Sequence, residues 1–435
     1  MAHRAVILGG GFGGLSAAQH LCRSDVDVTL IDQRNFHLFQ PLMYQVATGS
    51  LSPGEIAAPL RSVLSRCENI DVLLGEAVDL DPAARQVVLK DGARIGYDSL
   101  VVATGADGSY FGHDDWAVFA PYPKTLEAAI EIRSKIFFAF EAAERSADPE
   151  EVKTWLTFVV VGAGATGLEL AGALGEIARQ TLRHDFRSIK PQEARIVLMD
   201  GAPRVLPGYP DDLSSHAARL VERLGIEVMT GCVVRDVDAE SVSYEHEGRL
   251  HRIATRTVMW AGGIKATDFG RTLAERTNAP TDKSGRIAVE KDLTIPNFRD
   301  IFVIGDLALT HRDDKRPLPG VAQVAIQQGA YAAKEIEARC AGTESSAPFR
   351  YLDKGDMAVI GRAAAVANIF GIHVWGLPAW LVWLFIHLMY LVQFQSRILV
   401  FIQWGFLYLT FSRGSRLISG GDAAAMQIDA SKRRH

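Results

Sequence analysis

Two glycine-rich turns of the same type carry the strongest chemical signal in this sequence. They occupy residues 9–14 and 162–167, directly after the short apolar runs 5–8 and 158–161, and each reads G-x-G-x-x-G ahead of a helix-forming run. In such a turn the first glycine permits the tight bend, the second lets the backbone approach a pyrophosphate, and the third lets the helix pack on the strand. The helix N-terminus then faces the anion. One turn alone is weak evidence, but two in this context predict a chain that binds two dinucleotides.

An acidic residue follows each turn, at the end of the next predicted strand. Asp32 lies 23 residues beyond Gly9, where a carboxylate can bind a ribose 2′-hydroxyl. Asp200 lies 38 residues beyond Gly162, a longer spacing that an inserted loop explains. A carboxylate at this second position accepts a hydrogen bond from NAD and repels the 2′-phosphate of NADP. Arg204 is near, but three other residues come first. The alternative for both aspartates is an ordinary loop residue at a strand end.

Three further strands are predicted to end beside the nucleotides. The runs 100–103, 258–261 and 300–304 are apolar, and Asp306 follows the third after a single glycine. Asp306 would bind the ribityl hydroxyls of FAD, and a helix that begins near Val321 would direct its N–H groups at the flavin ring. These elements predict an α/β fold with two Rossmann-type dinucleotide-binding domains, the second inserted in the first. A chain of this kind is expected to pass electrons from one dinucleotide to the other.

The length of 435 residues allows two to three domains, with boundaries expected near 115, 285 and 345. The predicted FAD-binding domain is discontinuous and comprises 1–115 and 285–345, and the predicted NADH-binding domain comprises 116–284. The remaining residues, 346–435, form a predicted C-terminal domain of different composition.

Charge and cysteine content exclude several other classes of protein. The net charge of −5, with both signs mixed, is not that of a nucleic-acid-binding protein. The four cysteines stand singly, without a C-x-x-C pair or a Cys/His cluster at zinc spacing, so we expect neither a disulfide framework nor a metal site. Flavoproteins that reduce disulfides or oxidise sulfide use paired thiols, which are missing here. The first predicted strand begins at residue 5, with no signal segment before it, so the catalytic part is expected in the cytoplasm.

The C-terminal part lacks acidic residues from Met357 to Gly421 and holds four of the seven tryptophans. Two apolar runs predict amphipathic helices at about 377–394 and 398–411. In the first helix, one face carries aromatic residues with polar tips and the other carries aliphatic ones. The aromatic face consists of Trp380, Trp383, His387, Tyr390 and Phe394, and the aliphatic face consists of Leu381, Leu384, Phe385, Leu388 and Leu391.

A helix with two such faces favours the headgroup boundary of a membrane. The basic residues of the same stretch, Arg362, Arg397, Arg413 and Arg416, are expected to meet anionic lipid. Monotopic attachment is the interpretation we favour, and a transmembrane span and a buried dimer interface are the alternatives.

With these residues in view, the whole chain resembles the type II NADH dehydrogenases of the pyridine nucleotide-disulfide oxidoreductase superfamily. These are single-subunit NADH:quinone oxidoreductases that pump no protons. The resemblance rests on the segments 32–42, 44–49, 162–172 and 351–358 and on the A-Q-x-x-x-Q pattern at 322–327 that marks the quinone-binding helix of that family. It implies non-covalent FAD, NADH as electron donor, a membrane quinone as acceptor, and a homodimer attached to the cytoplasmic side of the inner membrane.

The resemblance also implies roles for individual residues. Glu169 would position NADH or relay a proton, and Gln323 and Gln327 would donate hydrogen bonds to a quinone carbonyl. Lys354 would stabilise negative charge near the flavin and the quinone. Met357 would form an apolar wall of the quinone channel. The alternatives are capping or solvated glutamines and a surface lysine. The family leads us to expect glutamate rather than aspartate at position 200, which leaves the strictness of the NADH preference open.

Three sets of binding residues are therefore expected. The FAD set is Gly9, Gly11, Phe12, Gly13, Gly14, Asp32, Val78, Ala103, Thr104, Gly105, Asp306, Ala322 and Gln323. The NADH set is Gly162, Gly164, Thr166, Gly167, Glu169, Asp200, Gly262 and Gly263. The quinone set is Gln323, Gln327, Lys354 and Met357. Two other functions are considered: a soluble FAD-dependent NAD(P)H reductase for a protein acceptor such as a ferredoxin, and a non-enzymatic NADH sensor at the membrane.

Overall fold

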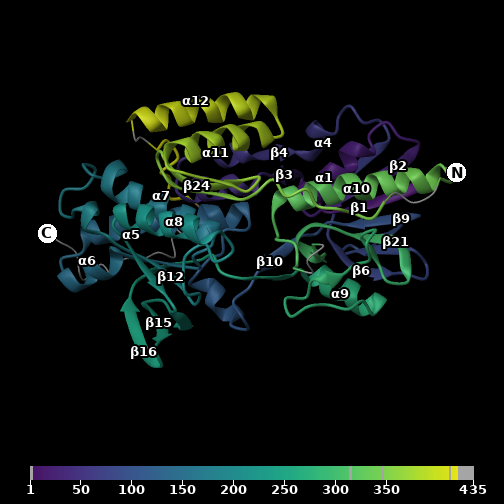
Figure 1. Ribbon diagram of the computed structural model, residues 1–435. Helices are drawn as coiled ribbons and strands as arrows, with labels where there is room; N and C mark the ends of the chain where they lie inside the picture. Colours follow the sequence, from purple (N-terminus) through teal and green to yellow (C-terminus); the bar gives the residue numbers. More distant parts are fainter. Residues whose placement is uncertain (1–2, 313–315, 344–346, 411–412, 420–435) are drawn as a thin grey trace. The chain divides into compact units, whose positions relative to one another are not determined.

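The structure, a computed structural model, describes residues 3–312, 316–343, 347–410 and 413–419. It forms two compact units (Figure 1). The first unit comprises Met1–Leu38, Ala57–Asp107 and Ile264–Leu352. The second unit comprises Phe39–Ile56, Gly108–Gly263 and Asp353–His435, so the contacts group the C-terminal residues with the segment that carries the second glycine turn. The division into three domains stays a prediction.

The first unit is built on a six-stranded sheet with the order β20-β21-β9-β1-β2-β5. Its strands are, in chain order, β1 (His3–Leu8), β2 (Val26–Asp32), β5 (Ile70–Leu74), β9 (Ser99–Val102), β20 (Thr294–Ile295) and β21 (Phe298–Val303). All neighbours are parallel except β20 and β21. β21 pairs with β9, with Ile301 opposite Leu100, so the chain returns after 290 to the sheet that contains the first turn. This pairing confirms the predicted α/β fold for this part of the chain.

Two helices of the first unit pack closely against each other, α1 (Phe12–His20) and α10 (Ala322–Cys340) (Figure 1). A Cβ on Gly329 of α10 would lie only 2.2 Å from the carbonyl oxygen of Gly13. The Ser16 hydroxyl donates a hydrogen bond to the carbonyl of Ile326, at 2.8 Å. Because the two backbones touch, the start of α10 is held beside the first glycine turn.

The second unit contains a parallel sheet with the order β13-β12-β11-β17, in which β11 leads into the second turn. Its strands are β11 (Thr157–Val161), β12 (Arg195–Asp200), β13 (Ile226–Thr230) and β17 (Thr257–Trp260). An antiparallel sheet of β14 (Val233–Val237), β15 (Ser241–His246) and β16 (Arg249–Ala254) adjoins it in the sequence. The helices of this segment are α5 (Leu126–Arg145), α6 (Pro149–Trp155), α7 (Ala165–Glu176) and α8 (Asp211–Arg223).

Shorter elements complete the two units. The remaining helices are α2 (Met43–Ala47), α3 (Pro53–Ile56), α4 (Leu60–Val63) and α9 (Asp268–Thr277). The remaining strands of the first unit include β3 (Phe36–Leu38), β4 (Ala57–Pro59), β6 (Ala77–Asp81), β7 (Gln86–Leu89), β8 (Arg94–Gly96), β18 (Ile264–Ala266), β19 (Ile287–Ala288) and β22 (Ala308–Leu309).

The C-terminal residues form an antiparallel sheet and two helices that belong to the second unit. The strands are β23 (Met357–Gly361), β24 (Ala364–Ile369) and β25 (Ile372–Trp375), and the helices are α11 (Leu377–Tyr390) and α12 (Phe394–Thr410). α7 packs directly on β23, since a Cβ on Gly172 would lie 1.7 Å from the carbonyl oxygen of Ile360. Figure 1 shows α11 and α12 side by side.

The first of the last two helices begins at Leu377 as predicted, but the break between the two helices was misplaced. The first helix ends at Tyr390 rather than at residue 394, and Phe394 begins the second. The backbone leaves the helical conformation at Leu391, whose carbonyl accepts a 2.7 Å hydrogen bond from Nε of Arg397. Phe411, the predicted end of the second helix, lies outside the described residues. Among the helices that the structure describes, none combines the length and the apolar character needed to cross a bilayer.

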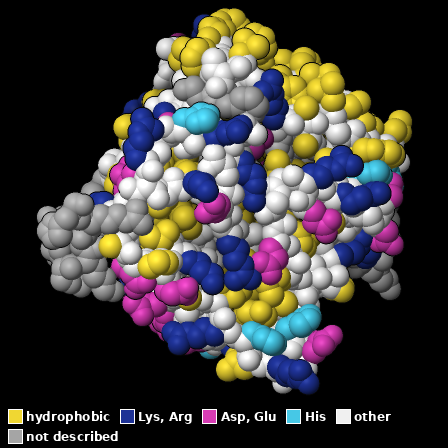
Figure 2. All heavy atoms as spheres, turned by 90° about the vertical axis from the view of Figure 1, so that its left-hand side faces the viewer, with side chains coloured by type: hydrophobic (Ala, Val, Ile, Leu, Met, Phe, Trp, Pro, Cys, Tyr) yellow, Lys and Arg dark blue, Asp and Glu magenta, His cyan; other side chains and the backbone are white. Residues whose placement is uncertain are grey.

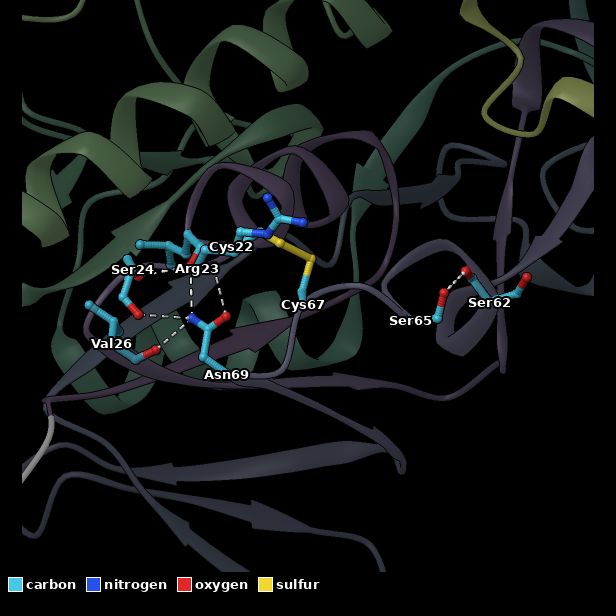
Figure 3. The surroundings of a disulfide bond; sticks show 9 residues. Cys22, Arg23, Ser24, Val26, Ser62, Ser65, Cys67 and Asn69 are labelled. Atoms are coloured by element: carbon cyan, nitrogen blue, oxygen red, sulfur yellow. Dashed lines mark hydrogen bonds between the residues drawn. A yellow bond between two sulfur atoms is a disulfide. The ribbon is translucent and has the colours of Figure 1, made fainter.

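The expectation of single cysteines without a disulfide was also wrong. Cys22 and Cys67 form a disulfide, with their Cα atoms 5.0 Å apart and a separation of 45 positions in the sequence (Figure 3). Beside it, the side-chain amide of Asn69 donates to the carbonyls of Leu21 and Val26, at 2.8 and 2.9 Å. Sequence spacing did not reveal the pair, because it is formed by residues that the parallel pairing of β2 with β5 brings together.

Candidate functional site

The first glycine turn joins β1 to α1, and its glycines are required by the geometry. Gly9 has a φ of +98°, and a Cβ on it would lie 2.4 Å from the carbonyl oxygen of Ala103. A Cβ on Gly14 would lie 1.8 Å from the carbonyl oxygen of Gly9. Around Gly11, by contrast, a Cβ would meet no atom within 4 Å. Gly11 is also the N-cap of α1 and provides no side-chain cap. The turn therefore leaves open space and backbone N–H donors, which is what a pyrophosphate requires.

Asp32 connects the end of β2 to this turn. Its Oδ2 accepts a hydrogen bond from the backbone N–H of Gly10 at 2.6 Å, and its Oδ1 accepts one from the N–H of Arg34 at 2.7 Å. Burial raises the pKa of the Asp32 carboxyl, and these two donors oppose the rise. The buried ring of His37 bonds the Gly10 carbonyl through Nδ1 at 2.9 Å and lies edge-on to Phe12, 5.0 Å between ring centres. His37 was not among the predicted site residues, because a contact to a backbone carbonyl leaves no sequence signal.

The other residues predicted for FAD also lie in the first unit. Thr104 and Gly105 follow β9, and the Thr104 hydroxyl lies 3.1 Å from the hydroxyl of Thr267. Asp306 lies in a 3₁₀ turn, and a Cβ on Gly320 would crowd its Oδ1 at 3.2 Å. The residues not yet placed are Gly13 at the start of α1, Val78 on β6, Ala103 after β9, and Ala322 and Gln323 at the start of α10.

A third glutamine of α10, Gln328, supports the Asp306 turn and was missed by the sequence argument. Gln328 is fully buried. Its Oε1 accepts a hydrogen bond from the Gly305 N–H at 2.7 Å, and its Nε2 donates to the Thr310 hydroxyl at 3.1 Å. Gly305 has a φ of +72°, so both the glycine and the buried amide fix the backbone beside Asp306.

The second glycine turn repeats the geometry of the first within the second unit. Gly162 has a φ of +104°, and a Cβ on it would lie 2.6 Å from the carbonyl carbon of Ala261. A Cβ on Gly167 would lie 1.7 Å from the carbonyl oxygen of Gly162. Gly164 caps α7 without a side chain, and a Cβ there would meet no atom within 4 Å. The two turns therefore offer the same kind of anion site.

Asp200 accepts hydrogen bonds at the second turn in the same way as Asp32 does at the first. Its Oδ2 accepts from the N–H of Ala163 at 2.6 Å, and its Oδ1 accepts from the N–H of Ala202 at 2.7 Å. The remaining residues predicted for NADH are Thr166 and Glu169 on α7 and Gly262 and Gly263 after β17. Gly263 has a φ of +78°, and a Cβ on it would lie 2.6 Å from the ring of Phe111. All eight predicted NADH residues lie in the second unit.

Glu169 lies on α7, where the helix packs on β23. Its Oε1 is 3.5 Å from the backbone N–H of Val359. Burial raises the pKa of the Glu169 carboxyl to about 8, and the contact with Val359 opposes the rise. Two buried tyrosines, Tyr44 and Tyr209, have pKa values well above the ordinary range, chiefly because of burial and in part because of the charge of Glu169. At neutral pH, Glu169 is therefore a protonated carboxyl in apolar surroundings, a state suited to proton transfer.

The predicted quinone residues are divided between the two units. Gln323 and Gln327 lie one turn apart on α10 of the first unit. Both ends of the Gln327 amide bind the backbone of Leu352: Nε2 donates to its carbonyl at 3.0 Å, and Oε1 accepts from its N–H at 2.9 Å. Gln327 thus holds the end of the first unit, and Gln323 lies nearer to the start of the helix.

Lys354 and Met357 lie in the second unit, before and at the start of β23. Nζ of Lys354 donates to the hydroxyl of Tyr390 at 3.2 Å. The loop between Lys354 and Met357 requires glycine at position 355. Gly355 has a φ of +93°, and a Cβ on it would lie 1.8 Å from the carbonyl oxygen of Asn368. The carbonyl of Met357 accepts a 3.0 Å hydrogen bond from the hydroxyl of Tyr209.

The side chains of the two C-terminal helices do not divide into buried and exposed along the two predicted faces. Trp380 and Trp383 of α11 and Trp404 of α12 are buried, and Nε1 of Trp404 donates to the side-chain Oε1 of Gln45 at 2.7 Å. Beyond Leu377, the exposed first residue of α11, the exposed large side chains are Leu381, Phe385, Met389 and Tyr390 on α11 and Phe394, Ile398, Leu399, Phe401, Ile402, Phe406 and Leu409 on α12. We call these eleven residues the apolar face. Figure 2 shows hydrophobic side chains at the top of the view, at the height of α12 in Figure 1. Tyr390 and Phe394, which the prediction placed on one face with the tryptophans, are among the exposed residues.

The expectation that the arginines of this region face lipid was wrong for three of them. Arg413 is 4% exposed; it pairs with Glu176 at 3.1 Å and donates to the hydroxyl of Thr48 at 3.0 Å. Arg416 pairs with Asp185. Nε of Arg397 donates a hydrogen bond to the carbonyl of Leu391, the residue that follows α11. These side chains fasten the C-terminal residues to the rest of the second unit.

Known proteins share both the sequence and the fold. The model of the pyridine nucleotide-disulphide oxidoreductases matches residues 3–329. The type II NADH:quinone oxidoreductase Ndh of Mycobacterium tuberculosis is 45% identical over 429 residues, which are 97% of this chain and 92% of that protein. The type II NADH:quinone oxidoreductase of Staphylococcus haemolyticus is 28% identical over 383 residues, 86% of this chain and 92% of that protein.

Among solved structures, NDH2 from Plasmodium falciparum in complex with NADH superposes with a TM-score of 0.86 at 20% identity, covering 97% of this chain and all of that one. Identity at this level establishes the fold alone. The relationship to the mycobacterial enzyme, over nearly the whole length of both chains, establishes the family. The chain therefore belongs to the type II NADH:quinone oxidoreductases, within the pyridine nucleotide-disulphide oxidoreductase family.

Proposed function

We propose that this chain oxidises NADH and transfers two electrons to a membrane quinone, with non-covalent FAD as its resident cofactor and without pumping protons. The observation that carries the proposal is the repeated turn. Each unit has a helix N-terminus without a side-chain cap, at a glycine where a Cβ would meet no atom within 4 Å, and a carboxylate that accepts a 2.6 Å hydrogen bond from the backbone of the turn. Family membership assigns the two turns to the two nucleotides. The absence of proton pumping is what the family implies.

The first unit fits FAD. Gly11 and the first turn of α1 would hold the pyrophosphate, and Asp32 would bind the adenosine ribose. Asp306, held by the Gly305 backbone and Gln328, would bind the ribityl chain. The α10 N-terminus, whose cap Val321 has no side-chain hydrogen bond, would stabilise negative charge on the ring. When bound, FAD accepts a hydride from the nicotinamide and passes two electrons to the quinone.

The second unit fits NADH by the same logic. Gly164 and the α7 N-terminus would hold the pyrophosphate, and Asp200 would accept a hydrogen bond from the free 2′-hydroxyl. Glu169 lies one turn along α7, so its carboxyl would lie on the nicotinamide side of the pyrophosphate. Because Glu169 keeps its proton at pH 7, it can hydrogen-bond a substrate as a donor or deliver that proton during quinone reduction.

The quinone residues are proposed on the family resemblance. Gln323 would donate its amide to a quinone carbonyl, and the ammonium of Lys354 would stabilise the charge that develops there. Tyr390 holds that ammonium at 3.2 Å. Met357 would form an apolar wall. Gln327, whose amide binds Leu352, would support this region by fixing the segment that leads to Lys354.

The enzymes of this family are associated with membranes, and the apolar face of α11 and α12 supports attachment to a lipid surface. Eleven large apolar side chains on two adjacent helices exceed what a soluble surface usually exposes in one place. We further propose attachment to the cytoplasmic side of the inner membrane and assembly as a homodimer, as the family resemblance implies.

One assay tests the proposal. Purified protein in detergent should be yellow, should release FAD on denaturation, and should oxidise NADH rapidly only when a short-chain quinone is present. A colourless protein that takes up no FAD contradicts the cofactor assignment. NADH oxidation that requires a ferredoxin rather than a quinone would favour the soluble reductase, and NADH binding without turnover would favour the sensor.

A further inference from the structure

We infer that Arg204 is a specificity-determining residue for the nucleotide: its guanidinium is held by neighbouring residues, so it does not offset the repulsion of a 2′-phosphate by Asp200. The inference rests on the proposed function, since it concerns the same nucleotide site. Arg204 is the only basic residue in the loop 201–210 that follows the ribose-binding carboxylate. A 2′-phosphate is usually bound by an arginine near this position.

Both terminal nitrogens of the Arg204 guanidinium contact other groups, in its own loop and at the start of α8. Nη2 donates to the carbonyls of Pro207 and Tyr209, at 3.0 and 2.9 Å. Nη1 lies 2.7 Å from Oδ1 of Asp211, the first residue of α8. To reach a 2′-phosphate, Arg204 would have to give up these partners. The loop therefore contains an arginine that could bind a 2′-phosphate, but its guanidinium stabilises the loop instead.

The loop itself is fastened at several points, so the position of the arginine is defined. The N–H of Leu206, a buried residue with a φ of +46°, donates to the carbonyl of Ala163 in the glycine turn at 2.8 Å. The carbonyl of Val205 accepts from the hydroxyl of Ser214 at 2.6 Å. These contacts tie the loop to the phosphate-binding turn on one side and to α8 on the other. Movement of the whole loop toward a phosphate would break them.

Two separate conditions follow for the binding of NADPH. The negative charge at position 200 must be removed, and the guanidinium must be released to pair with the phosphate. Of the three contacts of Arg204, only the one to Asp211 comes from a side chain that can be replaced without altering the backbone. Asp211 is 95% exposed, so its removal should disturb little else. We therefore expect Asp200→Asn and Asp211→Asn to act together rather than independently.

The experiment measures binding of adenosine 2′,5′-bisphosphate and of AMP by calorimetry, together with kcat/KM for NADPH and NADH. Asp211→Asn alone should change the bisphosphate-to-AMP affinity ratio by less than about twofold, because Asp200 still repels the phosphate. In the Asp200→Asn background, the same change should raise the ratio by about tenfold, which is what one charge-assisted hydrogen bond provides. Adding Arg204→Gln to the double variant should abolish that gain.

Asp212→Asn is the matched control. It removes the adjacent charge of α8, which pairs with His373 at 2.8 Å and does not contact Arg204. It should leave the ratio unchanged in either background. Melting curves with measured FAD content establish that each variant is folded.

Two results would overturn the inference: Asp211→Asn adds nothing to Asp200→Asn, or the gain survives Arg204→Gln. These failures are distinct from failure of the proposed function. A wild-type enzyme that does not oxidise NADH at all contradicts the function. The nucleotide affinity ratios test the inference without turnover.

Discussion

At the scale of single residues, Glu169 makes the sharpest prediction. Burial raises its pKa to about 8, whereas an exposed glutamate titrates near 4.5. Between pH 4.5 and about 8, Glu169 is protonated in the folded protein and ionised in the unfolded chain. The contribution of Glu169 to the free energy of unfolding therefore falls as the pH rises through this range. The Glu169→Gln variant keeps a neutral amide at every pH. We expect its melting temperature, relative to wild type, to rise from pH 5 to pH 8 and then level off.

The same variant should change the kinetics. If Glu169 delivers its proton during quinone reduction, the wild-type rate should fall as the pH rises through about 8, and Glu169→Gln should have a lower rate without that limb. Glu193→Gln, at an exposed glutamate, is the control and should match wild type in both measurements. A pH profile and a melting series that are identical for Glu169→Gln and wild type would contradict the assigned environment.

The two glutamines of α10 show what the sequence could and could not predict at this scale. Their spacing placed Gln323 and Gln327 on one face of a helix, which the structure has. No pattern in the sequence could show that Gln327 binds both backbone groups of Leu352, because that contact depends on a segment 25 residues away. The glycine turns were predictable because the close approach of backbone atoms within each turn allows only glycine at certain positions, and this leaves a local pattern in the sequence. His37 and Gln328 bind backbone and leave no such trace.

These contacts separate the two glutamines experimentally. Gln327→Met removes two hydrogen bonds to the backbone and should lower the stability of the protein by about 1–3 kcal/mol, measured by denaturant unfolding. Gln323→Met should have a smaller effect on stability but should raise the KM for quinone. Ferricyanide reduction by NADH, which needs no quinone site, should persist in both variants. Equal stability of the two variants would contradict the role given to Gln327.

At the scale of elements, the contact of α1 with α10 links the FAD turn to the helix that carries the glutamines. Gly329→Ala would place a Cβ 2.2 Å from the carbonyl oxygen of Gly13, so the helices must separate. We expect this variant to lose FAD or to bind it at least about tenfold more weakly, measured by flavin content and fluorescence. Gly405→Ala on α12 is the control. Its Cβ would meet no atom within 4 Å, and it should retain FAD and gain up to about 1 kcal/mol of stability.

The elements themselves were predictable to different degrees. The parallel strands and the start of α10 are encoded in apolar runs and glycine endings, and they occur where the sequence placed them. The break at Leu391 was not predicted, since the apolar pattern runs through it without proline or glycine. A tertiary contact, Arg397 to the Leu391 carbonyl, takes the place of a local stop signal.

At the scale of the whole molecule, the Cys22–Cys67 disulfide tests how far the first unit depends on a covalent link. Closing a loop of 45 residues restricts the unfolded chain, and the chain-entropy model gives at most about 4 kcal/mol for it. The double variant Cys22→Ser, Cys67→Ser should therefore melt several degrees lower and retain FAD under mild conditions. A reductant should lower the melting temperature of wild type toward that of the variant and leave the variant unaffected. A reductant that shifts both proteins equally would contradict this account.

The attachment of the molecule to lipid should depend on apolar contact rather than on charge. Arg413 and Arg416, which the sequence placed at anionic headgroups, pair instead with Glu176 and Asp185. High salt screens contacts between exposed charges but hardly weakens the burial of apolar side chains. We therefore expect membrane-bound protein to resist washing with concentrated salt and to be released by mild detergent, measured by quantitative immunoblotting of pellet and supernatant.

Charged residues placed on the apolar face provide the decisive variant. Phe385 and Phe401, 63% and 57% exposed, lie on α11 and α12. Replacing both by aspartate removes about 1.5–3 kcal/mol of burial at each position and adds a charge that lipid disfavours, so partition into vesicles should fall at least about 100-fold. Ferricyanide reduction by NADH should persist, because neither side chain contacts a glycine turn. Leu250→Asp, at a leucine 70% exposed on β16, should partition like wild type. If the double variant stays bound to vesicles, the apolar face is not the surface that meets the membrane, and a contact between protein copies becomes the better explanation of its exposure.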